Sequence, residues 1–166
     1  MGSADLVIVL MGVTGSGKTT VGRLLAARLG WEFADADQFH SPANVKKMAQ
    51  GIVLTDADRE PWLAVLRQAI VRWLAEDKNT VLACSALKRS YRDNLGVGGE
   101  VRLVYLKGSY DLIASRLRER HGHFATEAIL ADQFANLEEP QDSVTVNIQP
   151  GPLEIVSEIQ RKLGVL

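Results

Sequence analysis

The residues best suited to chemistry form a glycine-rich run near the amino terminus, Gly12-Val13-Thr14-Gly15-Ser16-Gly17-Lys18-Thr19. The run matches G-x-x-x-x-G-K-[ST], a pattern whose glycines let main-chain amides curl inward around an anion. Lys18 supplies a cation for the β and γ phosphates of a nucleotide, and the Thr19 hydroxyl is a ligand for the Mg²⁺ that bridges them. We therefore expect a nucleoside triphosphate to bind through Gly12, Thr14, Gly15, Ser16, Gly17, Lys18, Thr19 and Thr20.

Two carboxylates follow the next apolar segment, at Asp35 and Asp37. In an extended backbone, residues two apart point to the same side, so both carboxylates are expected to face the glycine-rich loop. Asp35 is then placed to hold Mg²⁺ through water, and Asp37 to accept the proton of an attacking hydroxyl. The alternative for either residue is a helix cap or a solvated loop charge.

Arg116 and Arg120 lie four residues apart on one face of a predicted helix, and Gly122 follows them. Phosphoryl transfer needs cations around the equatorial oxygens and exclusion of water, which a closing lid with arginines supplies. We predict such a lid at approximately residues 116–138, with both arginines on the nucleotide and Arg120 as the main transition-state cation. The alternative is a solvated helix surface.

These residues need elements that position them, and apolar runs alternate with helical patterns along the whole chain. Strands are expected at residues 6–11, 31–34, 80–83, 101–106 and 144–148, and helices at 18–29, 42–50, 62–76, 87–94, 110–120 and 152–163. This alternation predicts a three-layer α/β domain with a mainly parallel five-stranded sheet and right-handed crossovers. Loops at the carboxyl ends of such strands usually carry the site.

The composition limits the class of protein. The 166 residues, 46% of them hydrophobic, fit one domain over residues 1–166, and a net charge of −1 favours neither nucleic acid nor an anionic membrane. A single cysteine, Cys84, excludes an internal disulfide, and we expect it to be a packed small residue. The longest early apolar run, residues 6–11, is too short to span a membrane and lacks the flanks of a secretory signal, so a soluble protein is expected. The single cysteine suits a reducing cytoplasm.

A bound triphosphate leaves two classes open, a phosphotransferase and a GTP-operated switch. A switch carries an N-K-x-D guanine motif, whereas Asp77-Lys78-Asn79 has a different order and does not end a strand. No D-x-x-G motif directly follows a predicted strand either. The carboxylate pair at Asp35 and Asp37 favours the phosphotransferase.

Six blocks in order resemble the thermoresistant-type gluconokinase family, within the shikimate and nucleoside-monophosphate kinase-like group. They are Met11 to Thr19, Asp35 to His40, Asn44 with Lys47-Met48, Asp56 to Arg59 with Pro61-Trp62-Leu63, Cys84 to Lys88 with Tyr91-Arg92-Asp93, and Gly122-His123-Phe124. The match runs from about residue 6 to residue 140. One departure is His40-Ser41-Pro42, since the family often has His-Pro there.

The resemblance implies transfer of phosphate from ATP to the 6-hydroxyl of D-gluconate, with Mg²⁺, in a homodimer. It implies substrate contacts from Asp37, His40, Arg59, Ser85, Lys88, Arg92, His123 and Gln133. Arg59 or Arg92 is the expected partner of the gluconate carboxylate, because a guanidinium grips a carboxylate with two parallel bonds. A kinase of the same architecture acting on shikimate, a nucleoside monophosphate or another sugar acid remains an alternative, as does a nucleotide-dependent regulator.

Overall fold

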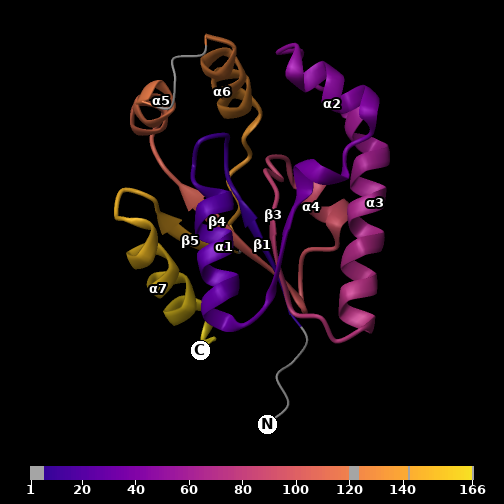
Figure 1. Ribbon diagram of the computed structural model, residues 1–166, viewed down its shortest axis with the longest axis vertical. Helices are drawn as coiled ribbons and strands as arrows, with labels where there is room; N and C mark the ends of the chain where they lie inside the picture. Colours follow the sequence, from indigo (N-terminus) through magenta and orange to yellow (C-terminus); the bar gives the residue numbers. More distant parts are fainter. Residues whose placement is uncertain (1–5, 120–123, 142, 166) are drawn as a thin grey trace.

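A parallel sheet of five strands forms the centre of the computed structural model, which describes residues 6–119, 124–141 and 143–165 (Figure 1). The strands are β1 (Val7–Met11), β2 (Glu32–Asp35), β3 (Thr80–Ala83), β4 (Val101–Lys107) and β5 (Val144–Asn147), in the order β2-β3-β1-β4-β5. All four neighbouring pairs are parallel. This confirms the predicted α/β fold.

The central strand β1 separates two hydrophobic layers, because its side chains alternate between the two faces of the sheet. Ile8 and Leu10 pack with the helices α1 (Lys18–Leu29), α5 (Tyr110–Glu119) and α7 (Pro152–Leu163). Val7, Val9 and Met11 pack with α3 (Asp56–Ala75) and α4 (Arg89–Leu95) on the other face. Every residue of β1 is fully buried, as a strand covered on both faces requires.

Two further helices stand beyond the carboxyl ends of the strands, at the top of Figure 1. They are α2 (Pro42–Ala49) and α6 (Phe124–Asn136), and a short 3₁₀ helix, η1 (Ala36–Phe39), follows β2. The proposed lid at residues 116–138 includes the end of α5 and all of α6.

The structure corrects the predicted start of the long helix, which begins at Asp56 and not at Trp62. Thr55 accepts a hydrogen bond from the amide of Asp58, and the Asp58 carboxylate accepts one from the amide of Thr55. This capping box fixes the first turn ahead of Pro61, which lies inside the helix and lacks one amide donor.

The structure also corrects the expected conformation after β2. The chain is not extended from Asp35 to Asp37, because Asp35 caps η1 by accepting a hydrogen bond from the Asp37 amide. Both carboxylates nevertheless line one cavity.

Within the described parts of the chain, no helix combines the length and the apolar character that a membrane crossing requires.

Candidate active site

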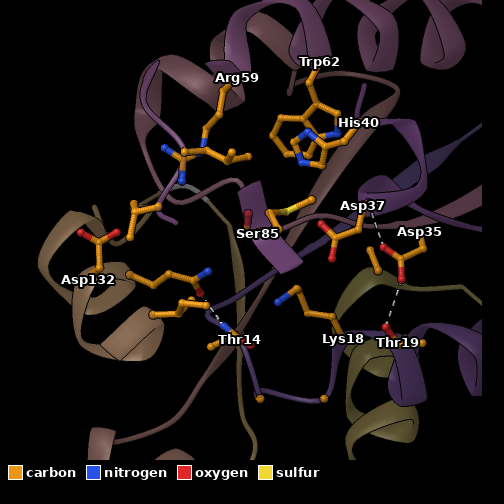
Figure 2. Close-up of a pocket in the computed structure, with 18 of the residues that line it drawn as sticks. Thr14, Lys18, Thr19, Asp35, Asp37, His40, Arg59, Trp62, Ser85 and Asp132 are labelled. Atoms are coloured by element: carbon orange, nitrogen blue, oxygen red, sulfur yellow. Dashed lines mark hydrogen bonds between the residues drawn. The ribbon is translucent and has the colours of Figure 1, made fainter. Parts of the chain in front are cut away.

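One cavity of about 370 Å³ opens at the carboxyl ends of β1, β2 and β3 (Figure 2). The glycine-rich loop and the start of α1 form its lower wall in this view, whereas His40, Arg59 and Trp62 lie at the top. Its lining comprises Thr14, Gly15, Gly17, Lys18, Thr19, Thr20, Asp35, Asp37, His40, Met48, Ile52, Val53, Leu54, Arg59, Trp62, Ala83, Ser85, Ile129, Asp132 and Gln133. The structure therefore brings together most of the predicted site residues.

The glycine-rich loop has the conformation that anion binding requires. Gly15 and Gly17 have φ of 78° and 94°, values that favour glycine, and α1 starts at the next residue. The positive end of this helix and the loop amides then point at the same space. The Lys18 ammonium donates to the carbonyls of Gly12, at 2.8 Å, and Val13, at 3.0 Å.

Burial lowers the pKa of Lys18, and the negative charge of Asp37 opposes this shift. An ammonium removed from water gains most from an anion placed beside it, because the local dielectric constant is low. The cavity thus has one desolvated cation at the end formed by the loop.

Thr19 and Asp35 form an oxygen pair beside this cation. The Thr19 hydroxyl donates to Asp35 Oδ2 at 3.4 Å, and the Asp37 amide donates to Asp35 Oδ1 at 3.0 Å. Among the described residues there is no cluster of three or more acidic, histidine or cysteine side chains that could cage a metal. A hydroxyl and a carboxylate nevertheless fit Mg²⁺, which keeps several waters and uses phosphate oxygens as its other ligands.

Asp37 has the electrostatic environment of a proton acceptor. Burial raises the pKa of its carboxyl group, the charge of Asp35 raises it further, and Lys18 opposes both effects. A carboxylate with a raised pKa is a stronger base, provided that it stays ionised at the working pH. Its side chain points into the cavity between Lys18 and His40 (Figure 2).

The far end of the cavity presents a neutral imidazole and a guanidinium. The ring of His40 stacks on Trp62 with centroids 4.2 Å apart, and Asn44 Nδ2 lies 3.3 Å from His40 Nδ1. Burial and the charge of Arg59 lower the pKa of His40 to about 4. With Asn44 as donor to Nδ1, the neutral ring carries its proton on Nε2 and is a hydrogen-bond donor there.

The helix α6 contacts the glycine-rich loop directly. The amide of Thr14 donates to Gln133 Oε1 at 2.6 Å, and Ile129 and Asp132 of the same helix also line the cavity. The helix α6, which is part of the segment predicted as a lid, therefore forms one wall of the cavity.

The structure does not bring the predicted Lys88 and Arg92 to the cavity. Lys88 pairs with Asp56, at 3.1 and 3.2 Å from its two carboxylate oxygens. The buried guanidinium of Arg92 donates to the carbonyls of Ala86 at 2.8 Å, Leu87 at 3.0 Å and Glu138 at 2.9 Å. These bonds give Arg92 a structural role, since its guanidinium supplies donors to three main-chain oxygens in a buried region.

The remaining predicted residues divide into two groups. Gly12 and Ser16 belong to the loop but do not line the cavity, and Arg116 donates to the carbonyl of Ile148 at 2.8 Å, beside the last strand. Arg120 and His123 lie outside the described residues.

Cys84 is a packed residue, as predicted. Its side chain is buried in the layer formed with α3, and burial raises the pKa of its thiol to about 12. A thiol with this pKa is almost entirely protonated at neutral pH, so Cys84 is not a nucleophile.

Sequence reasoning missed several lining residues, namely Met48, Ile52, Val53, Leu54, Trp62, Ala83, Ile129 and Asp132. Trp62 also belongs to the hydrophobic layer formed with α3. The others are mostly apolar, and their types carry no chemical signal that separates them from core residues. The sequence pattern does not predict α6, the helix on which Asp132 lies, so its position carries no signal either.

Comparisons with known proteins find close relatives over almost the whole chain. The family model described as shikimate kinase matches residues 14–159. A probable gluconokinase of Mus musculus is 42% identical over 95% of this chain and 97% of its own length. A gluconokinase of Gluconobacter oxydans is 43% identical over 97% of this chain and 93% of its own length. The crystal structure of a gluconokinase from Sinorhizobium meliloti superposes with a TM-score of 0.87 at 40% identity, covering 98% of this chain and 94% of that one.

Proposed function

Since the chain belongs to the gluconokinase family, within the wider group that the shikimate kinase model describes, we propose that it transfers the γ-phosphoryl group of ATP to the 6-hydroxyl of D-gluconate. One observation carries the proposal: a single cavity joins a phosphate-binding loop to an acceptor chamber that contains a base and a guanidinium. The products are 6-phosphogluconate and ADP.

The nucleotide is held at the end of the cavity formed by the glycine-rich loop. The loop amides and the start of α1 take the phosphates, and Lys18 exchanges its bonds to the Gly12 and Val13 carbonyls for phosphate oxygens. Because the ammonium already lies in the loop, this exchange needs only a small movement of the side chain.

Gluconate lies between Asp37 and Arg59. Asp37 orients the 6-hydroxyl and accepts its proton as the hydroxyl oxygen bonds to the γ phosphorus and the bond to the β-phosphate oxygen breaks. Arg59 binds the carboxylate at the other end of the molecule, while His40 Nε2 and Ser85 bond to the hydroxyls of the chain. This orientation uses the two chemically different ends of gluconate to select which hydroxyl reacts.

Thr19 and Asp35 would hold Mg²⁺, which supplies charge neutralisation across the β and γ phosphates when bound. The hydrogen bond between Asp35 and the Asp37 amide then ties the position of the base to that of the metal ligand.

A coupled ADP-release assay with ATP and magnesium tests the function across gluconate, shikimate, AMP and glucose. We expect turnover with gluconate and no more than background ADP release with the other three. Preference for shikimate or AMP would assign the chain to another kinase of this architecture. Nucleotide binding with no acceptor-dependent turnover would leave a regulatory protein.

A homodimer and a cytoplasmic location complete the proposal. The family resemblance supports the dimer, and a buried, unreactive Cys84 is compatible with a reducing compartment. Light scattering on the purified protein tests the dimer by giving its mass in solution.

A further inference from the structure

We propose that Tyr91 is a positioning residue for substrate recognition, because it aims the guanidinium of Arg59 at the acceptor's carboxylate. The inference rests on the proposed function and assigns a role to a side chain outside the cavity lining. Tyr91 lies on α4, whereas Arg59 lies on α3, so the contact joins two helices of the same layer.

Tyr91 contacts Arg59 with both its hydroxyl and its ring. Arg59 Nη1 donates to Tyr91 Oη at 3.2 Å, and the guanidinium carbon lies 5.5 Å from the centre of the ring. A hydrogen bond fixes the direction of one N–H group, and the ring face restricts the plane of the guanidinium. Together they hold a side chain that is otherwise flexible.

Tyr91 is itself fixed from behind. Its hydroxyl donates to Asp56 Oδ1. Both carboxylate oxygens of Asp56 also accept hydrogen bonds from the Lys88 ammonium. Because the hydroxyl proton points at Asp56, the lone pairs of Oη are left for the N–H of Arg59. Burial, followed by the bond to Asp56, raises the pKa of Tyr91, so the phenol keeps this proton at neutral pH.

The charges of the residues around Tyr91, namely Asp56 and Lys88, leave the Arg59 guanidinium available for an anion. Lys88 and Asp56 compensate each other, and Tyr91 is neutral. Among the described residues, the hydrogen bond to Tyr91 is the only one found for the Arg59 guanidinium, which has five N–H groups. Arg59 therefore presents a positive charge and several donors to the cavity, and its charge also lowers the pKa of His40.

The benefit to the enzyme is entropic. An arginine side chain loses much of its rotamer freedom when it is fixed. If Tyr91 fixes it before the substrate arrives, binding no longer bears most of that cost. Tyr91 should therefore affect the use of gluconate and leave the use of ATP unchanged.

The first variant is Tyr91→Phe, which keeps the ring and removes the hydroxyl. We expect kcat/KM for gluconate to fall about fivefold to tenfold, the size of one typical intramolecular hydrogen bond, with KM for ATP unchanged. The matched control is Tyr105→Phe, which removes another buried tyrosine hydroxyl, bonded to Glu139 at 3.0 Å outside the cavity lining. The control should keep kcat/KM for gluconate within about twofold of wild type.

A double-mutant cycle with Arg59→Ala separates positioning from a general structural effect, since coupled residues give non-additive changes. If Tyr91 acts through Arg59, Tyr91→Phe has almost no further effect on kcat/KM for gluconate in the Arg59→Ala background. Equal fold-changes in the two backgrounds would overturn the inference, as would an unchanged kcat/KM in Tyr91→Phe alone. Urea unfolding of each variant checks that the protein is folded.

The two proposals fail in different ways. If the wild-type protein does not phosphorylate gluconate, the proposed function is wrong and the positioning role falls with it. If the wild-type protein phosphorylates gluconate and the cycle is additive, only the role of Tyr91 is wrong.

Discussion

Individual side chains in the cavity owe their chemistry to their neighbours. Asp37 is made more basic by burial and by Asp35, whereas His40 is kept neutral by burial and by Arg59. Sequence reasoning named all four of these residues, but it could not predict the directions in which the pKa values of Asp37 and His40 shift. Those depend on which charges the fold brings together.

Replacing Asp37 with Asn tests the proton acceptor. The amide keeps the size of the side chain but cannot accept the proton, so we expect kcat with gluconate to fall at least about a hundredfold. Binding of a non-hydrolysable ATP analogue, measured by titration calorimetry, should change little. Asp93→Asn is the control, because it makes the same charge change at an exposed position on α4. Turnover near that of wild type in Asp37→Asn would remove Asp37 from the mechanism.

The lowered pKa of His40 predicts that the folded protein is less stable in acid. Its pKa is about 4 in the folded protein and 6.5 in the unfolded chain, so protonation favours the unfolded state. The free energy of unfolding should therefore fall as the pH is lowered from about 6.5 towards about 4. In His40→Gln this dependence should be weaker, and urea unfolding at several pH values measures it. The same pH dependence in both proteins would show that His40 does not contribute.

At the scale of elements, the sequence was most informative for the strands. Each predicted strand lies within two residues of the observed one, because five short apolar runs bounded by turn residues leave little choice. Helix starts were harder to predict. The helical pattern predicts a start at Trp62, whereas the capping box at Thr55 starts α3 at Asp56.

The turn after β2 shows a second limit of sequence reasoning. The spacing of Asp35 and Asp37 correctly predicts that both carboxylates face the same cavity. The assumed reason, an extended backbone, is wrong. The carboxylate of Asp35 bonds to a nearby amide instead and bends the chain into η1. Arg92 shows a third limit, since a charged side chain in a block that resembles a family motif can bond to the main chain rather than to the ligand.

The capping box at Thr55 gives a prediction about an element. Thr55→Ala removes the hydroxyl that accepts from the Asp58 amide, so the free energy of unfolding should fall by about 1 kcal/mol. Thr55→Ser keeps the oxygen and should restore most of this loss. Urea denaturation of the three proteins measures the effect, and equal midpoints in wild type and Thr55→Ala would contradict it.

For the molecule as a whole, two apolar layers on either side of one sheet provide the main stabilisation. The layers use different positions of the same strands, so a change in one layer leaves the side chains of the other in place. The site lies at the edge of these layers, where strand ends and helix starts meet, and Trp62 belongs both to the cavity lining and to one layer.

Adjacent residues of α3 test the contribution of one layer. Leu66 is fully buried and Val65 is 45% exposed. Leu66→Ala should lower the free energy of unfolding by about 2 to 5 kcal/mol, whereas Val65→Ala should change it by less than about 0.5 kcal/mol. Urea unfolding measures both values, and similar losses in the two variants would contradict the assignment of Leu66 to the core.

The burial of the Cys84 thiol has a practical consequence for fluorescence measurements of movements in this protein. Because its sulfur is buried and protonated, the wild-type chain should react very slowly with maleimide dyes. A single cysteine introduced at the exposed Ala131, on α6, would then carry a fluorophore with almost no background. The molecule is thus ready for single-site labelling without first removing a native thiol.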